Sequence, residues 1–422
     1  MTSSTNLSNI SSLRRLLSSV NFYIILLILS RFSLPLFINT VPPMDIQYIN
    51  LADKIASSST SITFSVSPFY ASIMYIVNIF FGNWKLSSLF LCSVFSIITG
   101  MLLYGLTKKM FNNDIAKIVL LLIIFHPNFT IALIGYSHTV IVSSAFLLLY
   151  FYYFWDLLTE RSTIYTYTIC SLAITVAILI RPELILYFLF FTLLHIGAVV
   201  FQKAKIDLLI RSRNTVFMVS IAVIVVAVQY TIIARRTNST FMNFFTDARY
   251  SYETYTHTLS LRSVGSIDAG LARKLASNAY GDPETFEYSV VQAILINPKE
   301  SAKNVGYNVR YLLQNAAHPL FMPFFLYFFI GIGIFVTSIH QTWKHYMLLI
   351  GILVPCLVSV LVFHVEVRYL NPIAIPCTIW LALGLHHLWV VNKKHVVYSF
   401  FCLYIVFFIA NVIYYSTNPI SI

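Results

Sequence analysis

The stretch Val216–Ile233 reads VFMVSIAVIVVAVQYTII and contains no charged residue. An apolar run of about 18 to 20 residues has the length of one helix across the hydrocarbon core of a bilayer. Leu320–Ile339, LFMPFFLYFFIGIGIFVTSI, repeats the pattern later in the chain. A membrane β-barrel would instead show alternating segments of about ten residues. Because a spanning segment must pair its own backbone polar groups, these runs predict membrane helices.

The composition of the whole chain agrees with this interpretation. Hydrophobic residues make up 58% of the 422 residues and charged residues only 10%, whereas soluble domains are about a quarter charged. The net charge of +12 fits basic loops that orient helices and meet anionic lipid. No basic-aromatic stripe typical of nucleic-acid channels occurs, so we expect membrane lipids and no nucleic acid as partners.

The cysteines indicate neither a disulfide framework nor a metal site. All five lie inside apolar runs, and none forms a CxxC pair. We therefore interpret them as small buried apolar residues.

The apolar runs predict an all-α polytopic membrane protein with about eleven spanning helices. The predicted spans are 21–39, 87–106, 115–133, 138–156, 165–181, 182–200, 214–234, 319–339, 345–364, 371–390 and 396–415. The first is interpreted as an uncleaved helix, although Arg31 interrupts it. Lysines and arginines concentrate in alternate loops, as at Lys108/Lys109 and Lys393/Lys394. By the positive-inside rule the N-terminus is cytoplasmic and the C-terminus lies outside.

Two stretches break the alternation of span and short loop. The first, 39–86, contains the apolar segment Pro68–Phe81. As a helix of 14 residues it reaches only ~21 Å, against a core of ~30 Å, so we expect an interfacial helix opened by Ser67-Pro68. The second, 234–318, is rich in charge and is expected to form a small outer domain with helices at Thr285–Leu295 and Pro298–Leu313.

Most acids near the predicted spans lie on the outer side, so we expect any active or binding face there. Asp45 follows Pro42-Pro43 directly after the first span. A carboxylate at this position can act as a general base for an acceptor hydroxyl or amine. It can also be an N-terminal helix cap or a solvated loop acid.

Two arginines stand at predicted outer membrane edges. Arg181 is followed two residues later by Glu183, and Arg368 lies between Glu366 and Tyr369. A guanidinium is a good bidentate partner for phosphate. Each arginine can also snorkel to the interface or pair with a nearby acid. The sequence leaves both interpretations open.

Other motifs of known chemistry are missing from the sequence. There is no P-loop, GxGxxG or GxSxG, which argues against use of a cytoplasmic nucleotide, and no HExxH or DxD that would hold a metal. His138 is the first residue of the predicted span 138–156, at its outer end. There it is either a binding residue or an interfacial anchor.

Taken in order, the motifs resemble those of the GT-C superfamily of membrane glycosyltransferases, especially the aminoarabinose and protein-mannosyl type. The family's acidic motif in the first outer loop matches Asp45-Ile46-Gln47-Tyr48. Its Pro-aromatic interfacial helix matches Ser67-Pro68-Phe69-Tyr70 through Phe81-Gly82. Its Arg-Pro matches Arg181-Pro182, and its Glu-x-Arg-Tyr-x-x-Pro matches Glu366-Val367-Arg368-Tyr369-Leu370-Asn371-Pro372.

This resemblance implies transfer of a hexosyl or pentosyl group from a polyprenyl-phosphate donor to a lipid-linked glycan or a protein, with inversion at the anomeric carbon. It implies Asp45 as the base and no cofactor. Ile46 replaces the family's second acid, and Ser137-His138 stand near another acidic position, so we expect no metal. The substrate-binding residues implied are Tyr48, His138, Arg181, Glu366, Arg368 and Tyr369.

The implied domain division has three parts. Residues 1–233 form an N-terminal transmembrane module with the catalytic first outer loop 39–86, residues 234–318 the outer helical domain, and residues 319–422 the C-terminal transmembrane helices. Such a protein would make cell-envelope glycan in a bacterial inner membrane, or work in the endoplasmic reticulum of a eukaryote.

Two other functions are weighed against this one. A transporter or flippase for an anionic lipid-linked substrate would use outer arginines as entry-site cations, but the internal repeats common in transporters are not visible. An inactive subunit of a glycan-assembly complex would be consistent with the missing acids.

Overall fold

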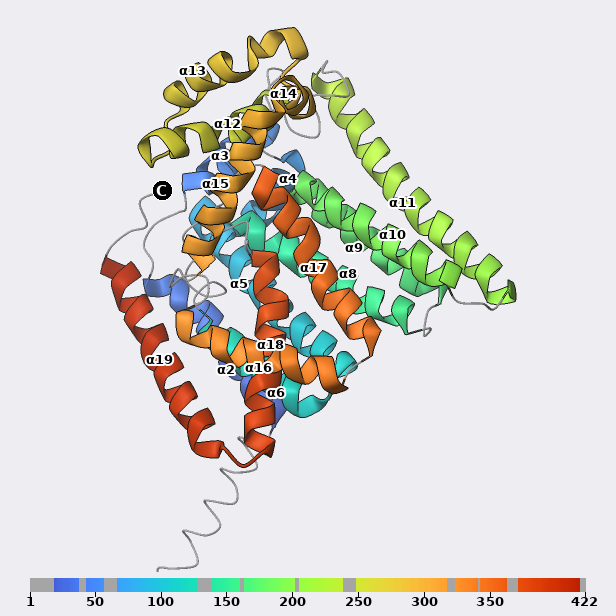
Figure 1. Ribbon diagram of the computed structural model, residues 1–422, viewed down its shortest axis with the longest axis vertical. Coiled ribbons are helices and arrows are strands. Elements are labelled where there is room, and N and C mark those ends of the chain that lie inside the picture. The colour runs from blue at the N-terminus through green and yellow to red at the C-terminus, as the bar shows by residue number, and fades with distance from the viewer. Residues whose placement is uncertain are drawn as a thin grey trace, which may run out of the picture.

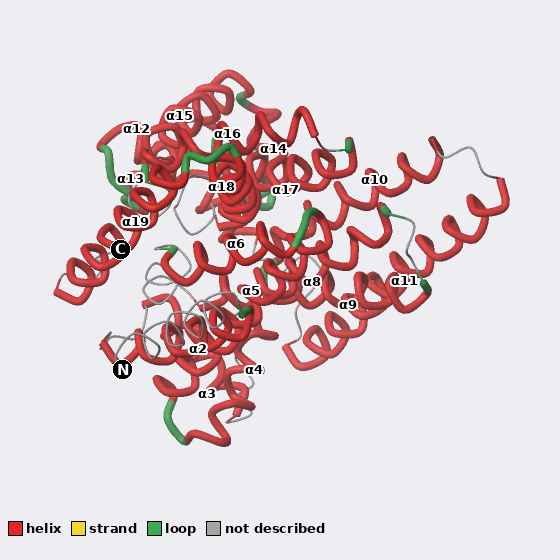
Figure 2. The backbone as a smooth tube through the Cα atoms, turned by 90° about the horizontal axis from the view of Figure 1, so that it is seen from below, coloured by secondary structure: helices red, strands yellow, loops and turns green. Residues whose placement is uncertain are grey.

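The computed structural model describes residues 19–37, 43–56, 67–126, 138–159, 163–201, 205–237, 248–316, 323–340, 342–362 and 371–417. Within these ranges the chain forms seventeen α-helices, two 3-10 turns and no strand (Figure 2). The expected all-α class is therefore confirmed.

The helices follow one another with short connections. In chain order they are α2 (Val20–Phe37), α3 (Pro43–Ala56), α4 (Pro68–Phe81), α5 (Trp84–Met110), α6 (Asn113–Phe125), α8 (His138–Leu158), α9 (Ile164–Ile180), η2 (Pro182–Leu184), α10 (Ile185–Phe201), α11 (Lys205–Thr237), α12 (Ala248–Val264), α13 (Ala269–Tyr280), η4 (Pro283–Phe286), α14 (Val290–Ile296), α15 (Pro298–Ala316), α16 (Phe324–His340), α17 (Trp343–Val362), α18 (Asn371–Val390) and α19 (Lys394–Thr417).

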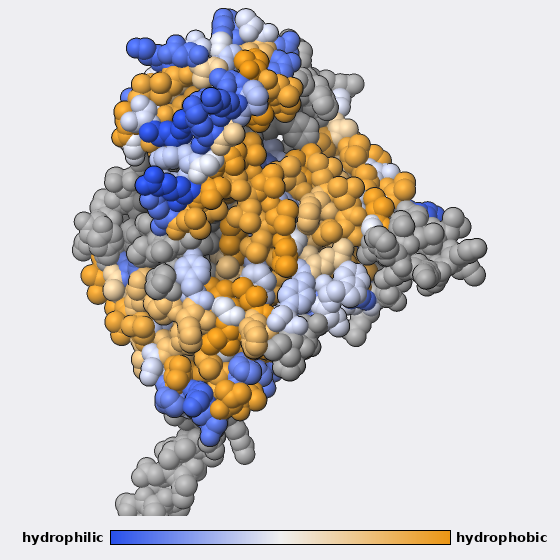
Figure 3. Space-filling view, viewed as in Figure 1, coloured by the Kyte–Doolittle hydropathy of each residue, from blue (hydrophilic) through white to orange (hydrophobic). Residues whose placement is uncertain are grey.

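The surface and the helix lengths mark a multi-pass membrane protein. Five described helical stretches are long and apolar enough to cross a membrane: Trp84–Met110, Thr139–Leu158, Trp343–Val362, Pro372–Val390 and Lys394–Ile413. Shorter apolar helices accompany them. Large apolar side chains such as Phe80 and Leu193 are exposed, and a broad apolar surface covers the middle of the molecule (Figure 3). The count of eleven spans and the cytoplasmic N-terminus stay predictions.

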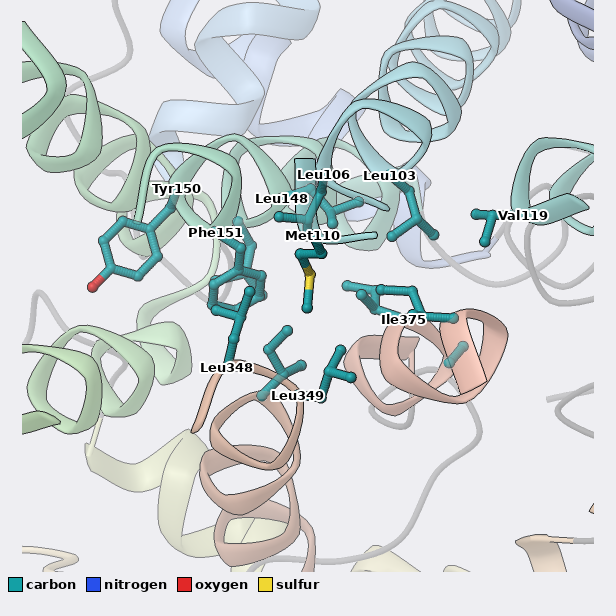
Figure 4. Packing of buried hydrophobic residues seen from close by; sticks show 14 of the residues in the cluster. Leu103, Leu106, Met110, Val119, Leu148, Tyr150, Phe151, Leu348, Leu349 and Ile375 are labelled. Atoms are coloured by element: carbon teal, nitrogen blue, oxygen red, sulfur yellow. The ribbon is translucent and has the colours of Figure 1, made fainter. Parts of the chain in front are cut away.

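A single large cluster of buried apolar side chains holds the membrane helices together. Figure 4 shows Met110 of α5 and Phe151 of α8 facing Leu348 and Leu349 of α17, with Ile375 of α18 beside them. In lipid, helices associate through close van der Waals packing rather than through removal of apolar surface from water.

The backbones of α16 and α18 approach each other closely. A Cβ atom on Gly333 would overlap the backbone carbonyl of Trp380, and one on Gly384 would overlap that of Phe329. Small residues at such crossings let membrane helices pack at short distance. This crossing fixes the C-terminal helices against each other.

One end of the molecule is a cluster of helices, and the opposite end is a turn between two helices (Figure 1). Helices α12 to α15 gather at the top of Figure 1, and the turn between α18 and α19 lies at the bottom. The upper helices have their own small core, made by Tyr252, Tyr255, Leu259, Ala276, Tyr280, Phe286 and Ala293. The lower turn carries Lys393 and Lys394.

Two sequence expectations about local structure need correction. The single helix expected over Thr285–Leu295 is wrong: Pro283 begins a 3-10 turn, and Glu287 and Tyr288 adopt positive φ, which ends it before α14. The helix expected at Pro298–Leu313 is confirmed as α15. The expectation that all five cysteines are buried is also wrong, because Cys402 is exposed on α19.

Candidate functional site

Helix α3 carries the first predicted site residues and packs on α4. The ring of Tyr48 meets the ring of Tyr70 edge-on, with 4.9 Å between the centroids. Leu51 and Ala52, one turn further along α3, are buried against Ala71 of α4. The face of α3 that carries Tyr48 is therefore turned toward α4. Asp45 lies one turn before Tyr48 on the backbone of α3.

Helix α4 has the bounds expected from its sequence. Ser67 is its N-cap, Pro68 is its first residue, and Gly82 ends it with φ of +59°. A left-handed C-terminal residue favours glycine because it has no Cβ. Exposed Ile79 and Phe80 lie on its outward side, as an interfacial helix requires, although its depth in the membrane stays a prediction.

The start of α4 is tied to the end of α9. The Ser67 hydroxyl donates a hydrogen bond to the carbonyl of Leu179. Tyr70 and Met74 of α4 share a buried cluster with Ile180, the last residue of α9. Because the next residue is Arg181, these contacts bring the first outer stretch to the corner that carries the candidate phosphate ligand.

Arg181 caps α9 and pairs with an acid beside it. Its backbone N–H donates to the carbonyl of Ala177 at 2.8 Å, and its guanidinium Nε donates to Glu183 Oε1 at 2.6 Å. A second guanidinium nitrogen, Nη2, also contacts that carboxylate. The side chain of Arg181 is 13% exposed and that of Glu183 is 36% exposed. Of the two interpretations left open, pairing with the neighbouring acid is present in the structure.

Helices α10 and α17 complete the surroundings of Arg181. Tyr187 of α10 and Cys356 of α17 are both buried, and both lie near Arg181. Pro355 lies inside α17, next to Cys356. The C-terminal half of α17 therefore comes close to the corner between α9 and α10.

Helix α15 contacts the C-terminal end of α17 through a hydrogen bond. The Asn308 amide donates to the carbonyl of Leu361 at 2.9 Å. Leu361 is in the last turn of α17, directly before residues 363–370. Helix α15 is thus anchored at the C-terminal end of α17.

Several predicted site residues lie outside the described part of the structure. This is true of Glu366, Arg368 and Tyr369, and of the side chains of Asp45 and His138, whose backbones lie in α3 and α8. The described contacts bring together Tyr48 and the Arg181 corner. The other assignments stay predictions.

The sequence did not indicate a role for Arg31, which lies in α2 and is 2% exposed. Its guanidinium donates to the carbonyl of Ile123 at 2.8 Å and reaches that of Ile124 at 3.5 Å. These carbonyls end α6, where a cation complements the helix dipole. The only sequence signal was a charge inside an apolar run, which did not reveal this partner.

The corner around Arg181 combines a cation with apolar surroundings. It joins an arginine, buried aromatic side chains and an apolar helix, α4, with exposed side chains. Among the described residues, no group of three or more His, Cys, Asp or Glu side chains could hold a metal ion.

Solved structures with a similar fold exist. The oligosaccharyltransferase of Archaeoglobus fulgidus, crystallised with zinc and sulfate, matches with a TM-score of 0.56 at 14% identity, over 92% of this chain and 53% of that one. Its apo form gives 0.53 at 13% identity, over 95% and 55%. This chain shares the fold of these oligosaccharyltransferase structures.

The likeness in fold between this chain and the solved structures occurs at low sequence identity. ArnT from Cupriavidus metallidurans, bound to undecaprenyl phosphate, is also similar, with a TM-score of 0.44 at 13% identity over 86% of this chain and 76% of that one. No protein-family model and no curated protein matches the sequence. The chain spans about half the length of the oligosaccharyltransferase structures that it matches.

Proposed function

We propose that this protein is a membrane glycosyltransferase that moves a sugar from a polyprenyl-phosphate donor to an acceptor on the outer face. The acceptor is a lipid-linked glycan or a protein. The first outer stretch supplies the base, and the outer domain and C-terminal helices complete the site, in the division 1–233, 234–318 and 319–422. The fold shared with the oligosaccharyltransferase structures supports this class of reaction.

The proposed reaction is a single inverting displacement. The acceptor oxygen or nitrogen attacks the anomeric carbon while the bond from that carbon to the phosphate oxygen breaks. The acceptor proton passes to the carboxylate of Asp45, and the lipid phosphate leaves with the bonding electrons. Arg181 and Arg368 are proposed to stabilise the negative charge on this leaving group.

One observation carries the proposal: the first outer stretch is fastened to the Arg181 corner. The Ser67–Leu179 hydrogen bond and the cluster of Tyr70 with Ile180 join the two, and Tyr48 packs on Tyr70. A base on α3 and a cation at the end of α9 therefore belong to one side of the bundle. Tyr48 and Tyr369 are proposed to shape the sugar site, with Glu366 and His138 contacting substrate.

The pairing of Arg181 with Glu183 is compatible with phosphate binding. A guanidinium carries five N–H donors in a fixed fork, and the Glu183 carboxylate contacts two of its nitrogens. An acid beside an arginine orients the fork while a phosphate approaches from another side. In this proposal Glu183 positions Arg181.

The purified protein in nanodiscs tests the proposal directly. It is incubated with radiolabelled polyprenyl-phosphate sugars and membrane extract as the acceptor source, and both release of polyprenyl phosphate and sugar transfer are measured. We expect both products in equal amounts. Movement of intact donor across proteoliposomes without its cleavage would instead identify a flippase.

A further inference from the structure

Helix α15 buries three polar side chains and exposes a row of apolar ones, beside the exposed polar residues Lys303 and Gln314. Its inward side carries Ser301, Asn304 and Asn308, which are 6%, 1% and 1% exposed. Its outward side carries Val305, Val309 and Leu313, which are 37%, 40% and 71% exposed. Spaced four residues apart, these three side chains form one row along the helix.

Hydrogen bonds fix the polar side of α15 inward. Ser301 Oγ lies 2.8 Å from the Tyr255 hydroxyl, and the Asn304 amide donates to the Tyr280 hydroxyl at 3.2 Å. Thr258 donates to Asn308 Oδ1 at 3.3 Å. Rotation of α15 to bury its valines would leave these buried polar groups unpaired, which is costly. The apolar row is therefore held outward by the fold.

The lower half of α15 lies at the outer boundary of the membrane helices. Asn308 bonds to Leu361, in the last turn of α17. Tyr311 and Leu312 pack against the large core cluster of the membrane helices. Figure 1 shows α15 descending from the upper domain to the ends of the membrane helices. Val309 and Leu313 are thus next in sequence to residues that contact the ends of the membrane helices.

A cationic side chain borders the apolar row. Arg310, next to Val309, is exposed. Helices that lie in a membrane interface combine apolar residues on one side with Lys or Arg beside them, because the guanidinium reaches the headgroup phosphates while the apolar side chains enter the acyl boundary.

We propose that α15 is an interfacial membrane-binding helix. Val305, Val309 and Leu313 enter the outer leaflet of the bilayer, and Arg310 contacts phospholipid headgroups. The inward hydrogen bonds of α15 transmit this attachment to α12 and α13. Lipid contact then holds the outer domain at a fixed height above the Arg181 corner, independently of whether the proposed transfer reaction takes place.

Spin labels in nanodiscs test this proposal. Single variants Val305→Cys, Val309→Cys and Leu313→Cys are made in a Cys402→Ser background, since Cys402 is exposed. The control is Lys274→Cys on α13, an exposed residue of the same domain. Collision of each label with oxygen, which enters lipid, is compared with collision with a water-soluble nickel chelate.

We expect all three α15 labels to favour oxygen, with the ratio of oxygen to nickel accessibility at least threefold above that of the Lys274→Cys label and highest at Leu313→Cys. Nickel accessibility equal to the control would mean that the row faces water and would overturn the proposal. An immobile label reached by neither reagent would mean that protein covers the row, which overturns it as well. Because the three positions are tested separately, failure of one variant to fold leaves two readouts.

Discussion

The edge-on contact between Tyr48 and Tyr70, with 4.9 Å between ring centroids, fastens the helix of the proposed base to α4. Edge-on aromatic pairs contribute about 0.5–1.5 kcal/mol beyond their buried area. Tyr70 is fully buried and belongs to the cluster that includes Ile180. The position of α3 therefore depends on a short chain of aromatic and aliphatic contacts that ends beside Arg181.

Replacement of Tyr48 by alanine is expected to loosen α3. The loss of the aromatic contact should lower the free energy of unfolding by about 1–3 kcal/mol and make the first outer stretch more sensitive to protease. Tyr48→Phe keeps the edge-on ring contact and should remain close to the parent. Thermal unfolding in detergent and timed proteolysis measure both effects. Equal behaviour of the two variants would contradict this role of the ring.

Arg181 and Glu183 offer a test of phosphate binding against simple ion pairing. If Arg181 binds the leaving phosphate, Arg181→Gln should raise the KM for the lipid-phosphate donor about tenfold or more, since hydrogen bonds to charged groups contribute about 1.5–3 kcal/mol. Glu183→Gln keeps the cation and keeps an oxygen that can accept from the guanidinium and position it, so it should raise KM by less than about threefold. If the pair serves only the fold, both variants will lose activity and thermal stability together.

The crossing of α16 and α18 should tolerate no added side-chain atom. Gly384→Ala places a methyl group on the backbone carbonyl of Phe329, so we expect a loss of more than about 3 kcal/mol of stability, as overpacking requires. Gly331→Ala on α16 is the control, because nothing lies within 4 Å of the added Cβ. The yield of monodisperse protein after detergent extraction reports the difference. A normal yield for Gly384→Ala would show that the crossing can widen.

Glu300 should make the outer domain sensitive to acid. The hydrogen bond from Lys303, together with the Arg262 guanidinium, holds the pKa of Glu300 below its ordinary value of 4.5. A lowered folded-state pKa contributes stability that is fully present above about pH 4.5 and is lost as the pH falls through the lower folded value. Glu300→Gln should therefore destabilise the domain by about 1–2 kcal/mol at neutral pH and flatten its acid transition.

The control for this variant is Glu284→Gln. Glu284 is exposed and lies in the 3-10 turn before α14, where loss of charge should have little effect. Thermal unfolding between pH 3 and pH 7, followed by tyrosine fluorescence or proteolysis of the domain, compares the two. If both variants follow the parent at every pH, the ion pairs of Glu300 contribute nothing to stability.

Local signals in the sequence predicted local structure well. Pro68 and Gly82 define the bounds of α4 because each acts on its own backbone. The Ser67 hydroxyl makes no capping hydrogen bond and donates to the carbonyl of Leu179 instead. The interruption at Glu287 and Tyr288 could not be predicted, since residues other than glycine rarely adopt positive φ. In the structure Tyr288 packs edge-on against Tyr252 of α12, a contact between residues far apart in the sequence.

The candidate site was predictable only in its parts. The residue types and their order suggested Tyr48 and Arg181, but the sequence does not say which helix ends meet. The Ser67–Leu179 bond and the packing of Tyr70 depend on residues more than a hundred positions apart. The partner of Arg31 was missed for the same reason, because a guanidinium bonded to the carbonyls that end α6 leaves no pattern in the sequence.

The central claim is that Asp45 removes the acceptor proton, and one rate comparison tests it most directly. Initial rates of sugar transfer from a polyprenyl-phosphate donor are measured for the parent, for Asp45→Asn and for Asp53→Asn, an exposed acid on the same helix. Loss of a general base lowers the rate by about 100- to 10,000-fold, so Asp45→Asn should fall at least about 100-fold while Asp53→Asn stays within about twofold. Undiminished transfer by Asp45→Asn would contradict the account.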